Sequence, residues 1–300
     1  MFGTEFLEPL IYKIADDSDL KILRSELNPE GWQRLAVWLE LSCTKPSWII
    51  FNLARGALIE ALVLLTHPGY GIPLECVRLF REPTGGSIDS RLFQFGINRA
   101  KICGARELFY STPEDCSEKE LIRELGFSLW REVYCYKSTG HVIAAVGDYR
   151  WVEAGMFPQS EVISLIEQTS ESSDDSQTKY YHHALGSYAD AKLTLETMQL
   201  ASHDRRWWHV ALSAGGQQVG LVLPVLEYGE LKIGFIGVVP EFRGRGIASF
   251  LLKQLLPVVK NSGYPAICAD VDQRNRPMRR ALVKSGFNLE HRKLEWRLTL

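Results

Sequence analysis

The pattern of apolar and polar positions along the chain predicts a mixed α/β protein. In the second half, three apolar, β-branched runs of strand length follow one another, at residues 208–213, 219–225 and 231–239. After the third run and a glycine-rich turn, apolar residues recur at helical spacing: Ile247, Leu251, Leu255 and Val259. From residue 149 onward we therefore expect a strand, two helices, three strands, a helix, a strand, a helix and a strand.

A polar segment separates the first two of these expected helices. Residues 170–179 contain no apolar side chain, which is typical of a surface loop or of a locally disordered stretch. The aromatic and imidazole run Tyr180-Tyr181-His182-His183 follows it directly. Neighbouring histidines on a helix point in different directions, so this run is not expected to bind a metal ion.

The two halves of the chain end in similar patterns. Residues 106–138 and 266–299 each predict a short strand, a polar turn, an amphipathic helix that ends in Gly-Phe, and an alternating strand. The Gly-Phe pairs are Gly126-Phe127 and Gly286-Phe287. We interpret this as two copies of one fold, with domains at residues 1–140 and 141–300. The alternative is that helix–Gly–Phe–strand is simply a common local pattern.

Composition narrows the class of protein. The chain has 300 residues, which suits two domains, and 46% of them are hydrophobic, which is enough for buried cores. A net charge of −2 does not favour a nucleic-acid binder. The six cysteines form no Cys-x-x-Cys pair, so we expect neither a zinc site nor a disulfide framework, and a cytoplasmic location fits best. We expect no signal peptide and no membrane span.

The turn after the third apolar run has the properties of an anion site. Arg243-Gly244-Arg245-Gly246 lies between an expected strand and an expected helix. The first N–H groups of a helix lack intrahelical acceptors and carry partial positive charge. Glycines without a Cβ allow a phosphate to approach the backbone closely. The segment therefore predicts a pyrophosphate cradle.

This segment resembles the acetyl-coenzyme A signature of the GNAT superfamily of N-acetyltransferases. The signature Arg/Gln-x-x-Gly-x-Gly/Ala is filled here by Arg243, Gly246 and Ala248. A second segment, residues 275–287, resembles the later helix of the family and keeps its Asn, Gly and Phe as Asn275, Gly286 and Phe287. Leu282 stands where the family often has a tyrosine thought to protonate the leaving thiolate. The resemblance covers about residues 148–300.

The resemblance implies a fold and a cosubstrate. The fold would be two tandem GNAT folds of mixed α+β type, each a mostly antiparallel sheet flanked by helices. The N-terminal copy is expected to be degenerate, because Gly85-Gly86-Ser87 lacks the Arg-x-x-Gly-x-Ala spacing. The residues expected to bind acetyl-CoA are Val238, Val239, Arg243, Gly244, Arg245, Gly246, Ile247, Ala248 and Asn275.

Amide formation also needs an oxyanion site and a proton acceptor. The N–H groups of Val238 and Val239 are expected to hold the thioester carbonyl oxygen. Candidate general bases are Glu227, Glu230, Asp270 and Asp272. The two glutamates could instead form a solvated hairpin tip, and Asp272 could cap a helix. One of the arginines Arg276, Arg279 and Arg280 is a candidate ligand of the 3′-phosphate, and residues 180–183 are candidates for lining the amine pocket.

The sequence thus predicts an N-acetyltransferase that moves an acetyl group from acetyl-CoA to a primary amine of a small-molecule or peptide acceptor. No metal, nucleic acid or membrane partner is expected, and the chain would be a monomer or homodimer. Two alternatives stay open: a coenzyme A-binding sensor without catalysis, and a transferase of the aminoacyl or peptidoglycan type.

Overall fold

The structure is a computed structural model. It describes residues 11–14, 21, 48–54, 57–65, 74–81, 90–102, 105–139, 148–201, 204–227 and 229–300.

The chain divides into two compact units that differ from the expected domains. The first unit is Met1–Trp130 with Leu294–Leu300, and the second is Arg131–Lys293. Both dividing points fall inside strands, β6 (Ser128–Ser138) and β12 (Asn288–Thr299). These dividing points do not match the boundary expected at residue 140. The first half of the sequence ends in β6, most of which belongs to the second unit, and the second half ends in β12, whose last residues belong to the first unit.

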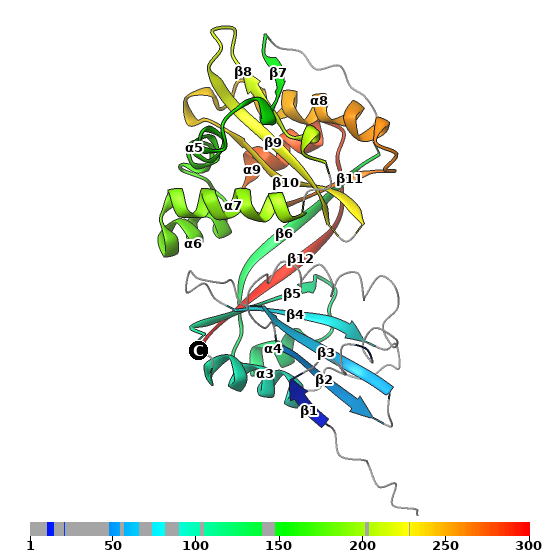
Figure 1. Cartoon of the computed structure of the whole chain (residues 1–300). Coiled ribbons are helices and arrows are strands. Elements are labelled where there is room, and N and C mark those ends of the chain that lie inside the picture. Colours follow the sequence, from blue (N-terminus) through cyan, green and yellow to red (C-terminus); the bar gives the residue numbers. More distant parts are fainter. Residues whose placement is uncertain are drawn as a thin grey trace, which may run out of the picture. The chain divides into compact units, whose positions relative to one another are not determined.

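The second unit is built on one twisted sheet (Figure 1). Its strand order is β12-β6-β11-β10-β9-β8-β7. The strands not yet bounded are β7 (Arg150–Glu153), β8 (His209–Leu212), β9 (Gln218–Glu227), β10 (Glu230–Val238) and β11 (Ile267–Asp272). Strands β7 to β10 form an antiparallel meander, β10 and β11 are parallel, and β11 is antiparallel to β6.

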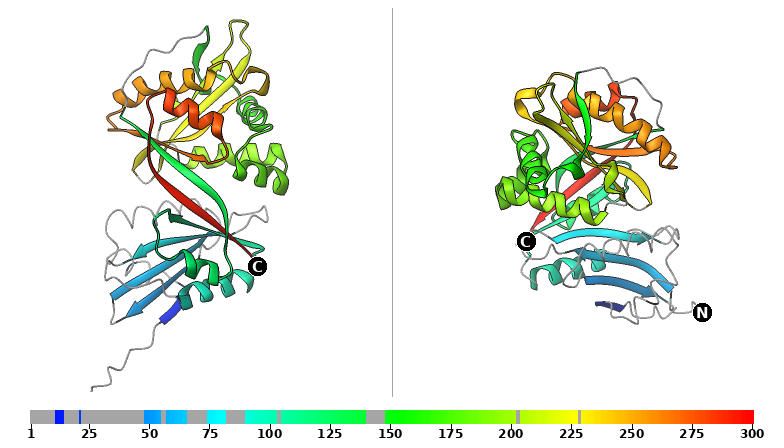
Figure 2. Two further views of the ribbon diagram at one scale, coloured as in Figure 1. Left: turned by 180° about the vertical axis from the view of Figure 1, so that it is seen from behind. Right: turned by 45° about the horizontal axis from the view of Figure 1, so that its top comes forward.

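Helices cover both faces of this sheet (Figure 2). On one face lie α8 (Ile247–Asn261) and α9 (Arg276–Lys284). On the other lie α5 (Gln159–Ser170), α6 (Ser176–Leu185) and α7 (Ser187–Ala201). Short 3₁₀ turns, Ala154–Met156, Arg205–Trp207 and Pro240–Phe242, join these elements.

Successive side chains of a strand point to opposite faces of the sheet, so the second unit has a hydrophobic core on each face. On β9, Val222 packs with the α8 side, whereas its neighbours Leu221 and Leu223 pack with α5 and α7. On β11, Ile267, Ala269 and Val271 all belong to the α8 core. The intervening residues of β11, among them Asp270 and Asp272, therefore face the α5–α7 side.

The expected order of elements is confirmed except for one helix. The polar segment 170–179 was expected to be a loop, but α6 begins inside it at Ser176. The carboxylate of Asp175 accepts the backbone N–H groups of Gln177 (2.9 Å) and Thr178 (3.0 Å). This N-cap starts a helix where the apolar pattern gave no signal.

The first unit has a similar strand order. Strands β1 (Ile11–Ile14), β2 (Trp48–Ala54), β3 (Ala57–Leu65) and β4 (Leu74–Arg81) form an antiparallel meander, and β4 is parallel to β5 (Glu107–Pro113), which neighbours β12. The helices described are α3 (Ser90–Ile102) and α4 (Lys119–Glu124). Phe93, Leu108, Phe127 and Trp296 are buried together, and Trp296 Nε1 donates to Thr112 Oγ1 at 2.9 Å.

The two Gly-Phe segments adopt the same helix end. Gly126 (φ +92°) and Gly286 (φ +86°) are left-handed. Phe127 donates its N–H to the Ile122 carbonyl (3.2 Å), and Phe287 donates to the Leu282 carbonyl (3.1 Å). Both ends are Schellman motifs, as the C-cap role of these glycines predicted. Both phenylalanines are buried.

Gly286→Ala is expected to lower the free energy of unfolding by about 1–2 kcal/mol, because a Cβ is disfavoured in the left-handed conformation. Gly286→Asn should cost less, since asparagine tolerates this conformation. Urea titration of the wild type and both variants measures the difference. Equal costs for alanine and asparagine would contradict the conformational explanation.

Candidate active site

The site forms where two parallel strands separate. Strands β10 and β11 pair only at Leu231–Ile267 and Lys232–Cys268. A register shift between Ile233 and Phe235 follows on β10. Beyond this point the two strands are no longer paired with each other, so the end of β10 presents a backbone edge on the side where β11 has left.

The backbone of Val238 faces this opening. Val239 donates its N–H to the Val219 carbonyl on β9 (3.0 Å), so Val239 and Val219 form a hydrogen-bonded pair. The preceding pair, Val238 and Gly220, is therefore a non-hydrogen-bonded pair whose N–H and C=O point away from β9. Of the two expected oxyanion donors, Val238 keeps the correct direction. The prediction for Val239 is wrong, because β9 already takes its N–H.

The glycine turn leads from this edge into α8. Gly244 (φ +79°) and Gly246 (φ +82°) are both left-handed, and a Cβ added at either would meet no atom within 4 Å. The first helical bond of α8 runs from the Phe250 N–H to the Gly246 carbonyl (2.9 Å). The N–H groups of Ile247, Ala248 and Ser249 thus precede the helical ladder and lack an acceptor within it. Open space, N–H groups without a helical acceptor and the helix dipole are the properties that an anion site needs.

Arg243 donates hydrogen bonds to backbone carbonyls of two elements. Its Nε donates to the Val238 carbonyl (3.1 Å). Its terminal nitrogens donate to the carbonyls of Thr169 (3.1 Å), Glu171 (2.6 Å) and Ser172 (3.5 Å). The guanidinium therefore donates to backbone carbonyls at the end of β10 and at the end of α5.

Arg245 stays at the surface of the turn. It donates to the Glu241 carbonyl (2.9 Å), and its guanidinium lies 5.0 Å from the centre of the Phe242 ring. Residue 245 is exposed. Its charge thus remains beside the anion site.

Helix α9 begins beside the end of β11. Asn275 caps it, since its Oδ1 accepts the Met278 N–H at 3.2 Å. Arg279 is held by the Tyr136 hydroxyl, the Gln273 carbonyl and the face of the Tyr134 ring. Arg276 and Arg280 are exposed. Leu282 is 1% exposed and lies in the α8 core, so this position offers no hydroxyl to a thiolate.

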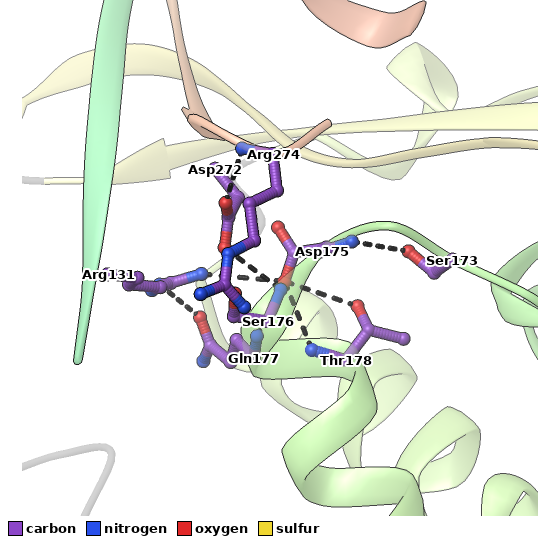
Figure 3. A network of polar contacts seen from close by, with 8 residues as sticks. All are labelled: Arg131, Ser173, Asp175, Ser176, Gln177, Thr178, Asp272 and Arg274. Carbon is purple, nitrogen blue, oxygen red and sulfur yellow. Dashed lines mark hydrogen bonds and ion pairs between the residues drawn. The ribbon is translucent and has the colours of Figure 1, made fainter. Parts of the chain in front are cut away.

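Asp272 is not placed as a general base. It is 1% exposed, and its two oxygens accept the N–H groups of Ser176 (2.9 Å) and Arg274 (2.7 Å). Figure 3 shows this carboxylate between the end of β11 and the start of α6. Burial and two backbone donors give it a structural role. Of the two predicted alternatives, a capping role is closer, although the helix it holds is α6.

Two of the other candidate bases, Glu227 and Asp270, belong to an ion network. Lys232 lies 2.5 Å from Glu227 and 2.8 Å from Asp270, and Lys293 lies 3.1 Å from Asp270. Although burial opposes it, these two ammonium groups hold the pKa of Asp270 well below its usual range. Burial raises the pKa of the neighbouring Cys135 to about 12, so this thiol is inert. Glu230 is exposed at the start of β10, at the end opposite the glycine turn.

A buried acid that the sequence analysis missed lies on α7. Asp190 is 6% exposed, and its Oδ2 lies 3.3 Å from Nε2 of His182 on α6. Burial and then the nearby Asp175 raise the pKa of Asp190 to about 7. Burial also lowers the pKa of His182, whereas Glu167 acts in the opposite direction. A single aspartate in a helix of mixed pattern gives no signal in the sequence, because its burial depends on α6.

The chain is similar to known proteins in sequence and in fold. The acetyltransferase (GNAT) family model matches residues 167–287. This match lies within the second unit and includes the glycine turn, α8, β11 and α9. No curated protein sequence matches the chain.

Solved structures share the fold. A GCN5-related N-acetyltransferase from Sphaerobacter thermophilus superposes with a TM-score of 0.68 at 16% identity, over 97% of this chain and 95% of that one. A tandem GNAT protein from the clavulanic acid biosynthesis pathway gives a TM-score of 0.64 at 16% identity, over 97% and 98%. At these identities the similarity shows the fold alone.

In the described ranges, no helix combines the length and the hydropathy that a membrane span requires. No three His, Cys, Asp or Glu side chains of this part of the chain gather in a way that could hold a metal ion.

Asp190→Asn is expected to stabilise the protein at high pH. Because the folded protein favours the protonated acid, its contribution to stability is present below the unfolded pKa and is lost as the pH rises through about 7. Asparagine mimics the neutral acid. Calorimetry should show Tm raised by about 2–4 °C at about pH 8.5 and little changed at about pH 4, close to the unfolded pKa of an aspartate.

Glu196→Gln is the matched control. Glu196 is a half-exposed acid on the same helix, 3.9 Å from Lys192. This variant should show no such difference between the two pH values. An equal effect of Asp190→Asn at both pH values would show that the buried group stays ionised.

Proposed function

We propose that the second unit binds acetyl-CoA at the opening between β10 and β11 and transfers its acetyl group to a primary amine. The observation that carries the proposal is the meeting of three features: the unpaired edge at Val238, the open glycine turn and the free N–H groups at the start of α8. The family match over residues 167–287 supports the same reading.

The cosubstrate would bind by its two most distinctive parts. Its pyrophosphate would sit on the N–H groups of Gly246, Ile247 and Ala248, with Arg245 adding charge from the surface. Its pantetheine arm carries two amides, which can pair with the open backbone edge of β10 as an added strand would. The arm would thereby bring the thioester to the opening.

The chemistry needs few side chains. The amine nitrogen attacks the thioester carbon, the carbonyl oxygen becomes an oxyanion, and the C–S bond then breaks to release the thiolate. The N–H of Val238 is oriented to donate to that oxyanion. The amine must also lose a proton, and the proposed acceptor is the buried Asp190 beside the half-buried His182. Water then supplies the thiolate proton, since Leu282 cannot.

A second candidate function is coenzyme A binding without catalysis. Leu282 favours it, because a buried aliphatic side chain occupies the position where a hydroxyl would protonate the leaving group. The two functions differ in turnover: an enzyme releases free coenzyme A thiol when acetyl-CoA meets an amine, whereas a sensor only binds.

The first unit is proposed to be a copy that has lost this site. Its strands β4 and β5 are parallel and pair at two positions only, Leu74–Leu108 and Glu75–Phe109, as β10 and β11 do. The following Gly126-Phe127 helix end repeats as well. Gly85-Gly86-Ser87, the segment expected in place of the glycine turn, lies outside the described residues. We also propose a small-molecule or peptide acceptor, a cytoplasmic location and a monomeric or homodimeric state.

Calorimetric titration with acetyl-CoA tests the site. The wild type should bind one molecule per chain, and Gly246→Glu should weaken binding at least about 100-fold, because the carboxylate would occupy and repel the pyrophosphate. Gly263→Glu is the matched control. Gly263 is also left-handed with open space around its Cβ, but it follows the far end of α8, about 22 Å away.

The control should bind within about threefold of the wild type. Equal losses in both variants would point to damage to the fold, and no binding by the wild type would overturn the proposal. Release of thiol in the presence of an amine panel, absent in Gly246→Glu, then separates the enzyme from the sensor.

A further inference from the structure

A short segment connects α5 to α6 and is held by hydrogen bonds at both ends. We call residues Glu171–Asp175 the strap. At its start, Arg243 binds the carbonyls of Thr169, Glu171 and Ser172 while it also binds the Val238 carbonyl. The start of the strap is therefore tied to the end of β10.

The other end of the strap is tied to β11 and β6. Asp272, the last residue of β11, accepts the Ser176 N–H at 2.9 Å. Arg131 on β6 donates to Gln177 Oε1 (2.6 Å) and lies 3.4 Å from Asp175 Oδ1. Figure 3 shows Arg131 and Asp272 meeting the first turn of α6.

The strap consequently crosses the opening. Strands β10 and β11 are unpaired beyond Lys232 and Cys268. The strap is bound at the separated ends of both strands, by Arg243 beside Val238 and by Asp272. The strap lies on the α5–α7 side, where the side chain of Asp272 points, whereas α8, which would hold the pyrophosphate, packs on the other face. A thioester in the opening would thus have the coenzyme on one side and the strap on the other.

The strap also holds a strained residue. Ser172 has φ +52°, the one positive φ of a non-glycine residue among those the structure describes. This conformation costs on the order of 1 kcal/mol and persists only where surrounding contacts impose it. The hydrogen bond from Arg243 to the Ser172 carbonyl, together with its bonds to Thr169 and Glu171, supplies those contacts.

We infer that Arg243 and Asp272 are positioning residues that hold the strap as the wall opposite the coenzyme, and that Arg243 couples this wall to the glycine turn. The inference rests on the proposed function for what lies in the opening. It assigns the arginine of the signature to the amine side of the reaction, because the guanidinium contacts the strap while Gly244 and Gly246 form the cradle. Coenzyme binding would make the backbone of the glycine turn more rigid. The hydrogen bonds of Arg243 would then make the strap more rigid as well.

Hydrogen exchange of residues 171–178, with and without coenzyme A as the probe, tests the inference. Arg243→Gln should exchange at least about tenfold faster than the wild type in this segment and bind coenzyme A within about threefold. Coenzyme A should slow exchange of the strap in the wild type but not in Arg243→Gln. Asp272→Asn, close in shape to the buried carboxylate, should accelerate exchange at Ser176 and leave coenzyme affinity unchanged.

Arg245→Gln is the matched control, since Arg245 lies in the same turn but contacts Glu241 and Phe242 instead of the strap. It should behave as the wild type in exchange. A large loss of coenzyme affinity in Arg243→Gln with unchanged strap exchange would overturn the inference and make Arg243 a phosphate ligand. Equal protection of the strap in Arg243→Gln and the wild type would overturn the coupling.

If the wild type fails to bind coenzyme A, the proposed function and the coupling both fail. Exchange without ligand still decides the anchoring, because Arg243→Gln and Asp272→Asn must loosen the strap whether or not a coenzyme binds.

Discussion

The early separation of β10 from β11 is the constraint on which the site depends. Because β10 and β11 pair at two positions only, the backbone groups of β10 beyond these positions have no partner on that side. The structure provides for them in two ways. Arg243 donates a hydrogen bond to the Val238 carbonyl, and the N–H of Val238 faces the space where a ligand would lie. A gap in the sheet thus becomes a place for an amide-bearing ligand.

Two kinds of interaction keep this gap open. The glycine turn carries the chain from β10 into α8 with left-handed residues at Gly244 and Gly246, so the helix begins beside the opening with its N–H groups exposed. On the other face, hydrogen bonds from Arg243 and to Asp272 hold the α5–α6 connection across the separated strands. Most of these bonds go to backbone groups, so they depend on the path of the chain more than on the identity of neighbouring side chains.

The parts of this site that the sequence predicted are those encoded locally. Strand, glycine turn and helix are contiguous at residues 231–259, and the Gly-Phe helix ends are short motifs with a defined backbone geometry. The roles of Arg243 and Asp272 could not be predicted in this way, because their partners lie about 70 to 100 residues away in the sequence. The same holds for Asp190, whose burial depends on packing between α6 and α7, and for the exchange of strand ends between the two units.

The most direct test of the account is a crystal structure of the protein with coenzyme A bound. The pyrophosphate is expected on the backbone N–H groups of Gly246 and Ile247, the pantetheine arm along the Val238 edge, and the Arg243 guanidinium still on the carbonyls of the strap. A pyrophosphate held by the Arg243 side chain, or a coenzyme bound away from the opening between β10 and β11, would contradict it.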